Sequence, residues 1–92
     1  MLAFFLTMLE SDEERQRFVL IYEQYHKRME RVALRILEKQ HDAEDAVQNA
    51  FLQVIHHFEK ISTIPCEELP FWLISIVKNE ALMILRKNRN IV

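Results

Sequence analysis

Two groups of polar side chains are spaced so that each would lie on one side of a helix. The first carries carboxylates and amides, and it comprises Asp42, Glu44, Asp45, Gln48, Asn49 and Gln53. The second mixes an aromatic ring, hydrogen-bonding groups and cations, and it comprises Trp72, Ser75, Lys78, Asn79 and Arg86. Carboxylates and amides suit a basic protein partner. The second mixture suits stacking on bases, reading base edges and holding phosphates. Both groups therefore offer binding chemistry.

The sequence carries no recognisable catalytic or metal-binding motif. A glycine-rich phosphate loop is impossible because there is no glycine. His56 and His57 are adjacent and would point about 100° apart on a helix, so they cannot easily share a metal. Cys66, the single cysteine, is followed by two glutamates whose negative charge disfavours a thiolate. We therefore predict that the protein is not an enzyme and that it uses no metal and no cofactor.

Each polar group also has an ordinary structural interpretation. The acids at 42–45 are equally well explained as the negative charge that stabilises a helix N-terminus. Trp72 competes as a core anchor and Asn79 as a cap for the preceding loop. A further basic row, at i, i+4 and i+8, comprises Lys27, Arg31 and Arg35. Its repulsion costs a few tenths of a kcal/mol per pair, which hints at an anionic partner, although a solvated face explains this row as well.

The elements that would position these side chains are all helices. With no glycine and only two prolines in 92 residues, the chain lacks the residues on which hairpins and tight turns depend. Its length suits one domain, and a hydrophobic fraction of 50% provides a small core. We predict an all-α fold, a compact bundle of three main helices plus a short N-terminal helix, in a single domain over residues 1–92.

Helix signals define the first two segments. Residues 1–9 are apolar but lack the basic start of a signal peptide, and acids follow from Glu10, so we expect a short helix over residues 1–10. Ser11 and Glu14 form a capping box that begins a long helix over about residues 12–38. Its apolar residues recur at intervals of three and four, and they are Phe18, Ile21, Tyr22, Tyr25, Met29, Val32, Ala33 and Ile36.

The second half of the chain predicts two more helices and a loop. Asp42 is expected to cap the next helix, with Glu44 and Asp45 in its first turn. Its apolar stripe is Ala43, Ala46, Val47, Ala50, Phe51, Val54, Ile55 and Phe58. Residues 59–69 form a loop, and Pro70 suits the first turn of a last helix that ends near Arg89. Apolar residues cover most of that helix, so we expect it to be sunk in the bundle with one narrow polar strip facing out.

Charge is unevenly distributed along the chain. The formal net charge is −2, yet residues 40–69 carry six acids and one base, and residues 70–92 carry four bases and one acid. This asymmetry suggests two surfaces with different partners, and the small total predicts weak binding of duplex DNA by the domain alone. The unpaired cysteine fits a reducing cytoplasm. No run is long enough to span a bilayer, so we expect a cytoplasmic protein without membrane contact.

Two stretches, taken together, resemble a known family. "DAEDAVQNAFLQVIHHF" at 42–58 and "FWLISIVKNEALMILRKNR" at 71–89 resemble region 2 of bacterial sigma-70 family factors, in the extracytoplasmic-function (ECF) subgroup. The family pattern is an acidic "DAEDxVQExF" helix, a variable loop and "WLxxIAxNxxxDxxR", and the resemblance covers about residues 12–89. Asn49 departs from the usual Glu, Leu69 from the usual Phe and Met83 from the usual Asp.

The resemblance implies two binding surfaces. In the family the acidic helix docks on the clamp coiled coil of the polymerase β′ subunit, and the matching residues here are Glu44, Asp45, Gln48, Asn49 and Leu52. The family's loop and last helix hold the melted non-template strand of the minus-ten promoter element and capture a flipped base. The residues that correspond to this DNA-binding surface are Lys60, Ser62, Thr63, Trp72, Ser75, Lys78, Asn79 and Arg86.

The resemblance thus implies a sigma factor domain that binds core RNA polymerase and promoter DNA in transcription initiation. An anti-sigma factor is a further implied partner, and no small-molecule substrate is implied. Family members normally carry a second domain, region 4, and nothing after Arg89 supplies it, so we expect either a separated first domain or a shortened paralogue. The alternative is a helical protein–protein module that binds polymerase or an anti-sigma factor without reading DNA.

Overall fold

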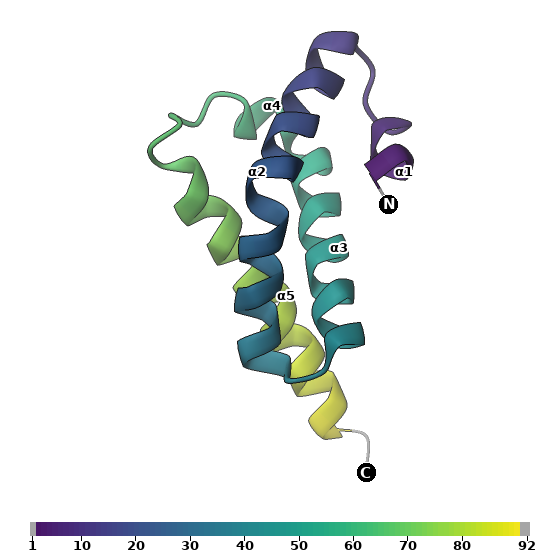
Figure 1. The fold of residues 1–92 in the computed structure, drawn as a ribbon, viewed down its shortest axis with the longest axis vertical. Coiled ribbons are helices and arrows are strands. Elements are labelled where there is room, and N and C mark those ends of the chain that lie inside the picture. The colour runs from purple at the N-terminus through teal and green to yellow at the C-terminus, as the bar shows by residue number, and fades with distance from the viewer. Residues whose placement is uncertain (1, 91–92) are drawn as a thin grey trace.

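The computed structural model describes residues 2–90, which form five α-helices and no strand (Figure 1). In chain order the helices are α1 (Leu2–Leu6), α2 (Asp12–Leu37), α3 (Gln40–His56), α4 (Phe58–Ile61) and α5 (Leu69–Asn90). The long helices α2, α3 and α5 all pack on one another, in a body that measures 45 × 27 × 19 Å. This arrangement confirms the predicted all-α bundle. Met1 and residues 91–92 of the predicted segments lie outside the described residues.

The capping box predicted at the start of α2 is confirmed. Ser11 Oγ accepts a hydrogen bond from the Glu14 amide at 3.1 Å, and Glu14 Oε1 accepts one from the Ser11 amide at 3.3 Å. These bonds satisfy backbone donors that have no partner inside the helix. The helix then continues to Leu37, one residue short of the predicted end.

The prediction that Asp42 caps α3 is wrong. Lys39 is the N-cap residue, so Asp42 lies inside the first turn, and Glu44 and Asp45 lie beyond it. The reason is the short connection between the helices, because Glu38 adopts a left-handed φ of 66° and lets α3 start at Gln40. Asp42 instead accepts a hydrogen bond from Asn88 Nδ2 of α5 at 3.2 Å.

A continuous apolar core fills the space between α2, α3 and α5, and α1 packs beside it against α2 and α3 (Figure 1). Phe5 of α1 is fully buried, with its ring centroid 6.0 Å from that of Phe51. Arg15 of α2 fastens this segment, since its Nε donates to the Leu6 carbonyl at 3.3 Å and its Nη2 donates to the Leu9 carbonyl at 3.0 Å. The helix predicted over residues 1–10 is therefore shorter, Leu2–Leu6, and a turn fixed by Arg15 follows it.

The predicted loop over residues 59–69 is wrong at its start, because Phe58–Ile61 form the short helix α4. Phe58 and Ile61 are buried, and this burial holds the helical turn against the core. The remaining loop, residues 62–68, crosses from α4 to α5 (Figure 1). Ile64 is its buried anchor, and Pro65 to Glu68 are exposed.

The expectation that α5 is sunk in the bundle with one narrow polar strip is also wrong. Its buried residues form a single stripe of Leu69, Leu73, Val77 and Ala81. Much of the rest is exposed, and it includes Phe71, Trp72, Leu82 and Met83. The physical reason is that, within residues 2–90, α5 packs mainly on α2 and α3, so no further helix covers its outer side. The apolar composition of α5 therefore describes a partly uncovered surface.

Candidate protein and nucleic-acid interfaces

One continuous side of α3 points away from the core. It contains Glu44, Asp45, Gln48, Asn49 and Leu52, which we call the α3 outer face. Glu44 and Asn49 are exposed, and the other three are half-buried at the base of this surface. The structure therefore brings together all five residues that the family resemblance assigns to the polymerase.

Hydrogen bonds organise one edge of the α3 outer face. Gln40 Nε2 donates to Glu44 Oε1 at 3.2 Å and to Glu30 Oε1 of α2 at 2.8 Å, so a single amide links two carboxylates. His41 Nε2 lies 3.6 Å from Asp45 Oδ2 at a solvent-exposed position. Such exposed pairs contribute little stability. The carboxylates therefore remain available to a basic partner.

One titratable group behind this edge, the Tyr22 hydroxyl, has a shifted pKa. Tyr22 stacks on His26 with centroids 4.6 Å apart, and His26 Nδ1 lies 2.7 Å from the Tyr22 carbonyl oxygen. Burial raises the pKa of the Tyr22 hydroxyl above its ordinary value of 10.0, and the negative charge of Glu30 raises this pKa further. The phenol therefore stays neutral at physiological pH.

Trp72, Asn79 and Lys60 surround one hollow between α3, α4 and α5. The hollow has a volume of about 300 Å³ and is also lined by Gln53, His57, Ile61, Ile76 and Glu80. Lys60 Nζ lies 5.2 Å from the centroid of the Trp72 ring, a cation–π contact. An aromatic wall, an amide and a cation therefore meet beside the loop, as a base-binding site requires.

Neither structural alternative for Trp72 and Asn79 agrees with the observed geometry. Trp72 is 40% exposed, so it is not a core anchor. Asn79 is exposed, and its side chain makes no hydrogen bond among residues 2–90, so it does not cap the loop. Both side chains are available to a ligand.

The remaining predicted DNA-binding residues lie in three other places. Ser75 and Lys78 line a second hollow, of about 600 Å³, between α2, α5 and the loop. Arg86 is exposed further along α5. Ser62 Oγ donates to the Glu59 carbonyl at 2.8 Å, and Thr63 Oγ1 donates to the Lys60 carbonyl at 2.7 Å. These hydroxyls therefore end α4 and keep only their acceptor lone pairs for a base.

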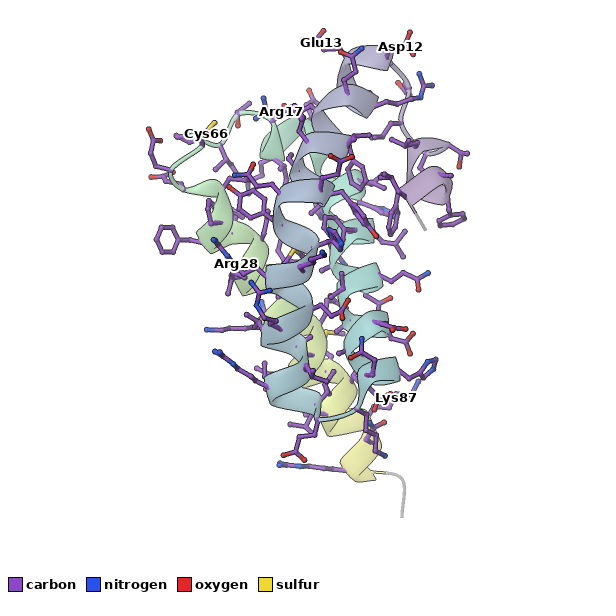
Figure 2. All side chains as sticks on the ribbon, viewed as in Figure 1. Asp12, Glu13, Arg17, Arg28, Cys66 and Lys87 are labelled. Carbon is purple, nitrogen blue, oxygen red and sulfur yellow. The ribbon has the colours of Figure 1, made fainter. Side chains whose placement is uncertain are left out.

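Sequence reasoning missed two residues that line the second hollow, Arg28 and Phe71. Arg28 of α2 reaches the hollow that contains Ser75 and Lys78 (Figure 2). Phe71, at the same hollow, is 75% exposed. The spacing of Phe71 from the buried Leu73 and Val77 was a usable signal, because it places the ring on another side of α5. Arg28 had no comparable signal, since only tertiary packing joins it to α5.

No group of three or more His, Cys, Asp and Glu side chains in residues 2–90 is arranged to hold a metal ion. No helix in that range is long and apolar enough to cross a membrane. Cys66 is exposed and makes no disulfide.

Comparison with known proteins identifies the class of the fold and its surfaces. The family model described as Sigma-70 region 2 matches residues 21–91, which include most of α2 and all of α3, α4 and α5. The chain therefore belongs to the Sigma-70 region 2 family, which implies a sigma factor role in polymerase binding and promoter recognition. A search of curated proteins and a search of solved structures return no match.

Proposed function

We propose that the chain is the promoter-melting domain of an ECF-type sigma factor. The α3 outer face docks on the clamp coiled coil of the polymerase β′ subunit. The loop and α5 hold the melted non-template strand of the minus-ten element. A protein with these partners acts in the bacterial cytoplasm.

The observation that carries this proposal is the hollow shared by Trp72, Asn79 and Lys60. Its aromatic wall supports stacking, its amide offers both a donor and an acceptor to a base edge, and its cation supports a phosphate contact. Opening a base out of a duplex costs a few kcal/mol, and contacts of this kind recover that cost.

The separation of the two surfaces supports the same function. The α3 outer face carries Glu44 and Asp45, whereas the DNA-binding set on α5 carries Lys78 and Arg86. Opposite charge on the two surfaces favours a basic protein partner for the first and an anionic partner for the second. A domain that joins polymerase to DNA needs both.

A pull-down with the β′ clamp fragment tests the polymerase surface. The double variant Asp45→Lys with Gln48→Ala is expected to abolish binding while leaving helicity unchanged. Glu23→Lys with Gln24→Ala is the matched control, because both residues are exposed on α2 and the charge change is identical. The control should bind like the wild type. Unchanged clamp binding by the first variant would reject the assignment of the α3 outer face.

The DNA surface is then tested in the assembled holoenzyme. Minus-ten binding by wild-type and Asn79→Ala chains separates a DNA-reading domain from a polymerase-binding module without DNA contact. The second candidate has one supporting observation, the exposed Leu82 and Met83 on α5, which suit a protein partner such as an anti-sigma factor. Holoenzyme assembly with no effect of Asn79→Ala on promoter binding would favour that candidate.

A further inference from the structure

Three arginines of α2 lie on one side of the helix and are unneutralised. Arg28, Arg31 and Arg35 are separated by three and four residues, and all three are exposed. We call them the arginine row. None of them forms an ion pair with an acid within residues 2–90. The Arg28 guanidinium carbon lies over the Tyr25 ring, 5.7 Å from its centroid.

The fold does not by itself account for the arginine row. Like charges at i, i+3 and i+4 destabilise a helix, and the acids of the first turn of α2, Asp12, Glu13 and Glu14, are several turns away. The helix dipole favours a cation in the last turn, where Arg35 lies, but this effect fades within one turn. Arg28 and Arg31 therefore form no ion pair within residues 2–90, so their charges can meet an external anion.

The arginine row continues onto α5. Arg28 lines the hollow of about 600 Å³ that also contains Lys78, Ser75 and the exposed Phe71. Figure 2 shows Arg28 on the side of α2 that borders α5. One acid, Glu67, also lines this hollow. Cations from two helices thus share one side of the bundle, and this side is formed by α2 and α5 and not by α3.

We propose that the arginine row and Lys78 form a second DNA contact, which binds the phosphate backbone without reading sequence. The proposal rests on the proposed function, because Ser75 and Lys78 belong to the promoter-binding set and the row extends that set. Arg28 and Arg35 are seven residues apart, about 10 Å along the helix axis. Measured along the DNA axis, that length covers roughly three phosphates of one strand, at about 3.4 Å of axis for each. Guanidinium groups bind phosphate oxygens in a paired geometry that suits such a contact.

An acidic protein surface is the competing occupant of the arginine row. DNA is favoured because the row is continuous with Ser75 and Lys78, and because an exposed aromatic ring, Phe71, stands beside the cations. Aromatic and cationic groups in one groove are typical of nucleic-acid sites. The α3 outer face, in contrast, offers the protein-binding chemistry on another helix.

The test measures how binding of duplex DNA depends on salt. The probe is a fluorescent 30-base-pair duplex of arbitrary sequence, titrated with the 92-residue chain at several low salt concentrations. Arg31→Gln with Arg35→Gln removes two charges from the row. Lys39→Gln with Lys87→Gln removes two charges elsewhere, and the Lys39 side chain makes no capping hydrogen bond. All variants are first checked for helicity and unfolding midpoint.

The expected result is a loss of salt sensitivity in the row variant only. Each phosphate contact contributes about 0.9 to the slope of log affinity against log salt, so two contacts contribute about 1.8. Raising salt from 50 to 200 mM should then weaken the wild type about 12-fold more than the row variant. Equal slopes for the wild type and the row variant, or equal loss in the lysine control, would overturn the proposal.

Clamp binding distinguishes failure of this proposal from failure of the proposed function. The row variant should bind the β′ clamp fragment like the wild type, and the Asp45→Lys, Gln48→Ala variant should keep the wild-type salt slope. Loss of clamp binding in the row variant would assign the row to a protein and overturn the DNA contact. The proposed function would instead be rejected if the wild type and the row variant differ in salt slope as expected but the wild type does not bind the clamp fragment.

Discussion

Lys60 Nζ lies over the face of Trp72, 5.2 Å from the ring centroid, so the cation covers the surface on which a base would stack. Trp72 is 40% exposed, and it is the single tryptophan of the chain. Its fluorescence therefore reports on this hollow alone. A bound base must either displace the ammonium or share the ring with it.

Single-stranded DNA should quench Trp72 more strongly than duplex DNA of the same sequence. Lys60→Met should remove the cation–π contact, worth about 0.5–1 kcal/mol at an exposed site, and weaken single-strand binding because a phosphate contact is lost. Titration of the intrinsic fluorescence measures both effects. Identical quenching by single strand and duplex would contradict stacking on Trp72.

Asn79→Ala should weaken binding of single-stranded DNA without destabilising the fold. Because the Asn79 side chain is exposed and has no hydrogen-bond partner within residues 2–90, its loss should leave the thermal midpoint nearly unchanged. Loss of a base-edge contact should cost about 1–3 kcal/mol of single-strand binding. Val77→Ala, at a fully buried position two residues earlier, is the opposite control and should lower the midpoint. If Asn79→Ala melts the fold and spares DNA binding, the residue belongs to the scaffold.

Neighbouring phenylalanines of α1 give a matched test of how this short helix is held. Phe5 is fully buried, with its ring 5.6 Å from that of Phe18, whereas Phe4 is 55% exposed. Phe5→Ala should destabilise the chain by about 3 kcal/mol, because it removes apolar contacts and leaves a cavity. Phe4→Ala should change stability by no more than about 0.5 kcal/mol. Denaturant unfolding measures both, and equal effects would show that α1 is not docked through Phe5.

Tyr22 predicts a loss of stability at alkaline pH. Burial, with a smaller contribution from Glu30, raises the pKa of its hydroxyl above 10.0. The folded chain therefore favours the neutral phenol. This contribution to stability is fully present below pH 10.0 and is lost as the pH rises through the raised pKa. Tyr22→Phe should remove that part of the pH dependence.

Phenolate absorbance of the Tyr25→Phe variant measures the Tyr22 pKa directly. Glu30→Gln should lower this pKa only part of the way toward 10.0, since burial is the larger cause. A full return to 10.0 would mean that the Glu30 charge dominates.

The loop over residues 62–68 should exchange its amide hydrogens fastest at its exposed tip. The Cys66 and Glu67 amides make no backbone hydrogen bond within the described residues, whereas the Ile64 amide donates to the Ile61 carbonyl at 3.1 Å. Local opening governs exchange, and exposed groups with few contacts open most readily. Hydrogen exchange resolved by residue checks this order. Protection of Cys66 equal to that of α2 would contradict it.

Local signals in the sequence predicted the helices well where a single residue decides the boundary. The Ser11 and Glu14 capping box lies within four residues, so the start of α2 was readable. The start of α3 was not, because it depends on Glu38 adopting a left-handed conformation that only glycine or asparagine would have signalled. Asp42 was a better capping residue by type than Lys39 and was therefore misplaced.

The sequence allowed us to predict which residues belong to the candidate sites, but not which of these residues lie together. Family resemblance selected Trp72, Asn79 and Lys60, and the fold places them around one hollow. The same resemblance put Ser75 and Lys78 with them, yet these two face a different hollow with Arg28. The helical period gives the direction in which a side chain leaves the axis of its helix. It does not say which neighbouring helix lies in that direction.

The two-residue connection between α2 and α3 has a mechanical consequence. Only Glu38 and Lys39 separate α2 from α3, and both helices pack on α5. The two helices therefore form one rigid unit. The proposed polymerase face lies on α3 and the arginine row lies on α2, so the packing of the core fixes the distance between them. The loop over 62–68, which is exposed from Pro65 to Glu68, is the part that we expect to adjust. If the proposed function and the proposed backbone contact hold, promoters that differ in the captured base are accommodated by changes in this loop, while the DNA-backbone contact keeps a constant distance from the polymerase.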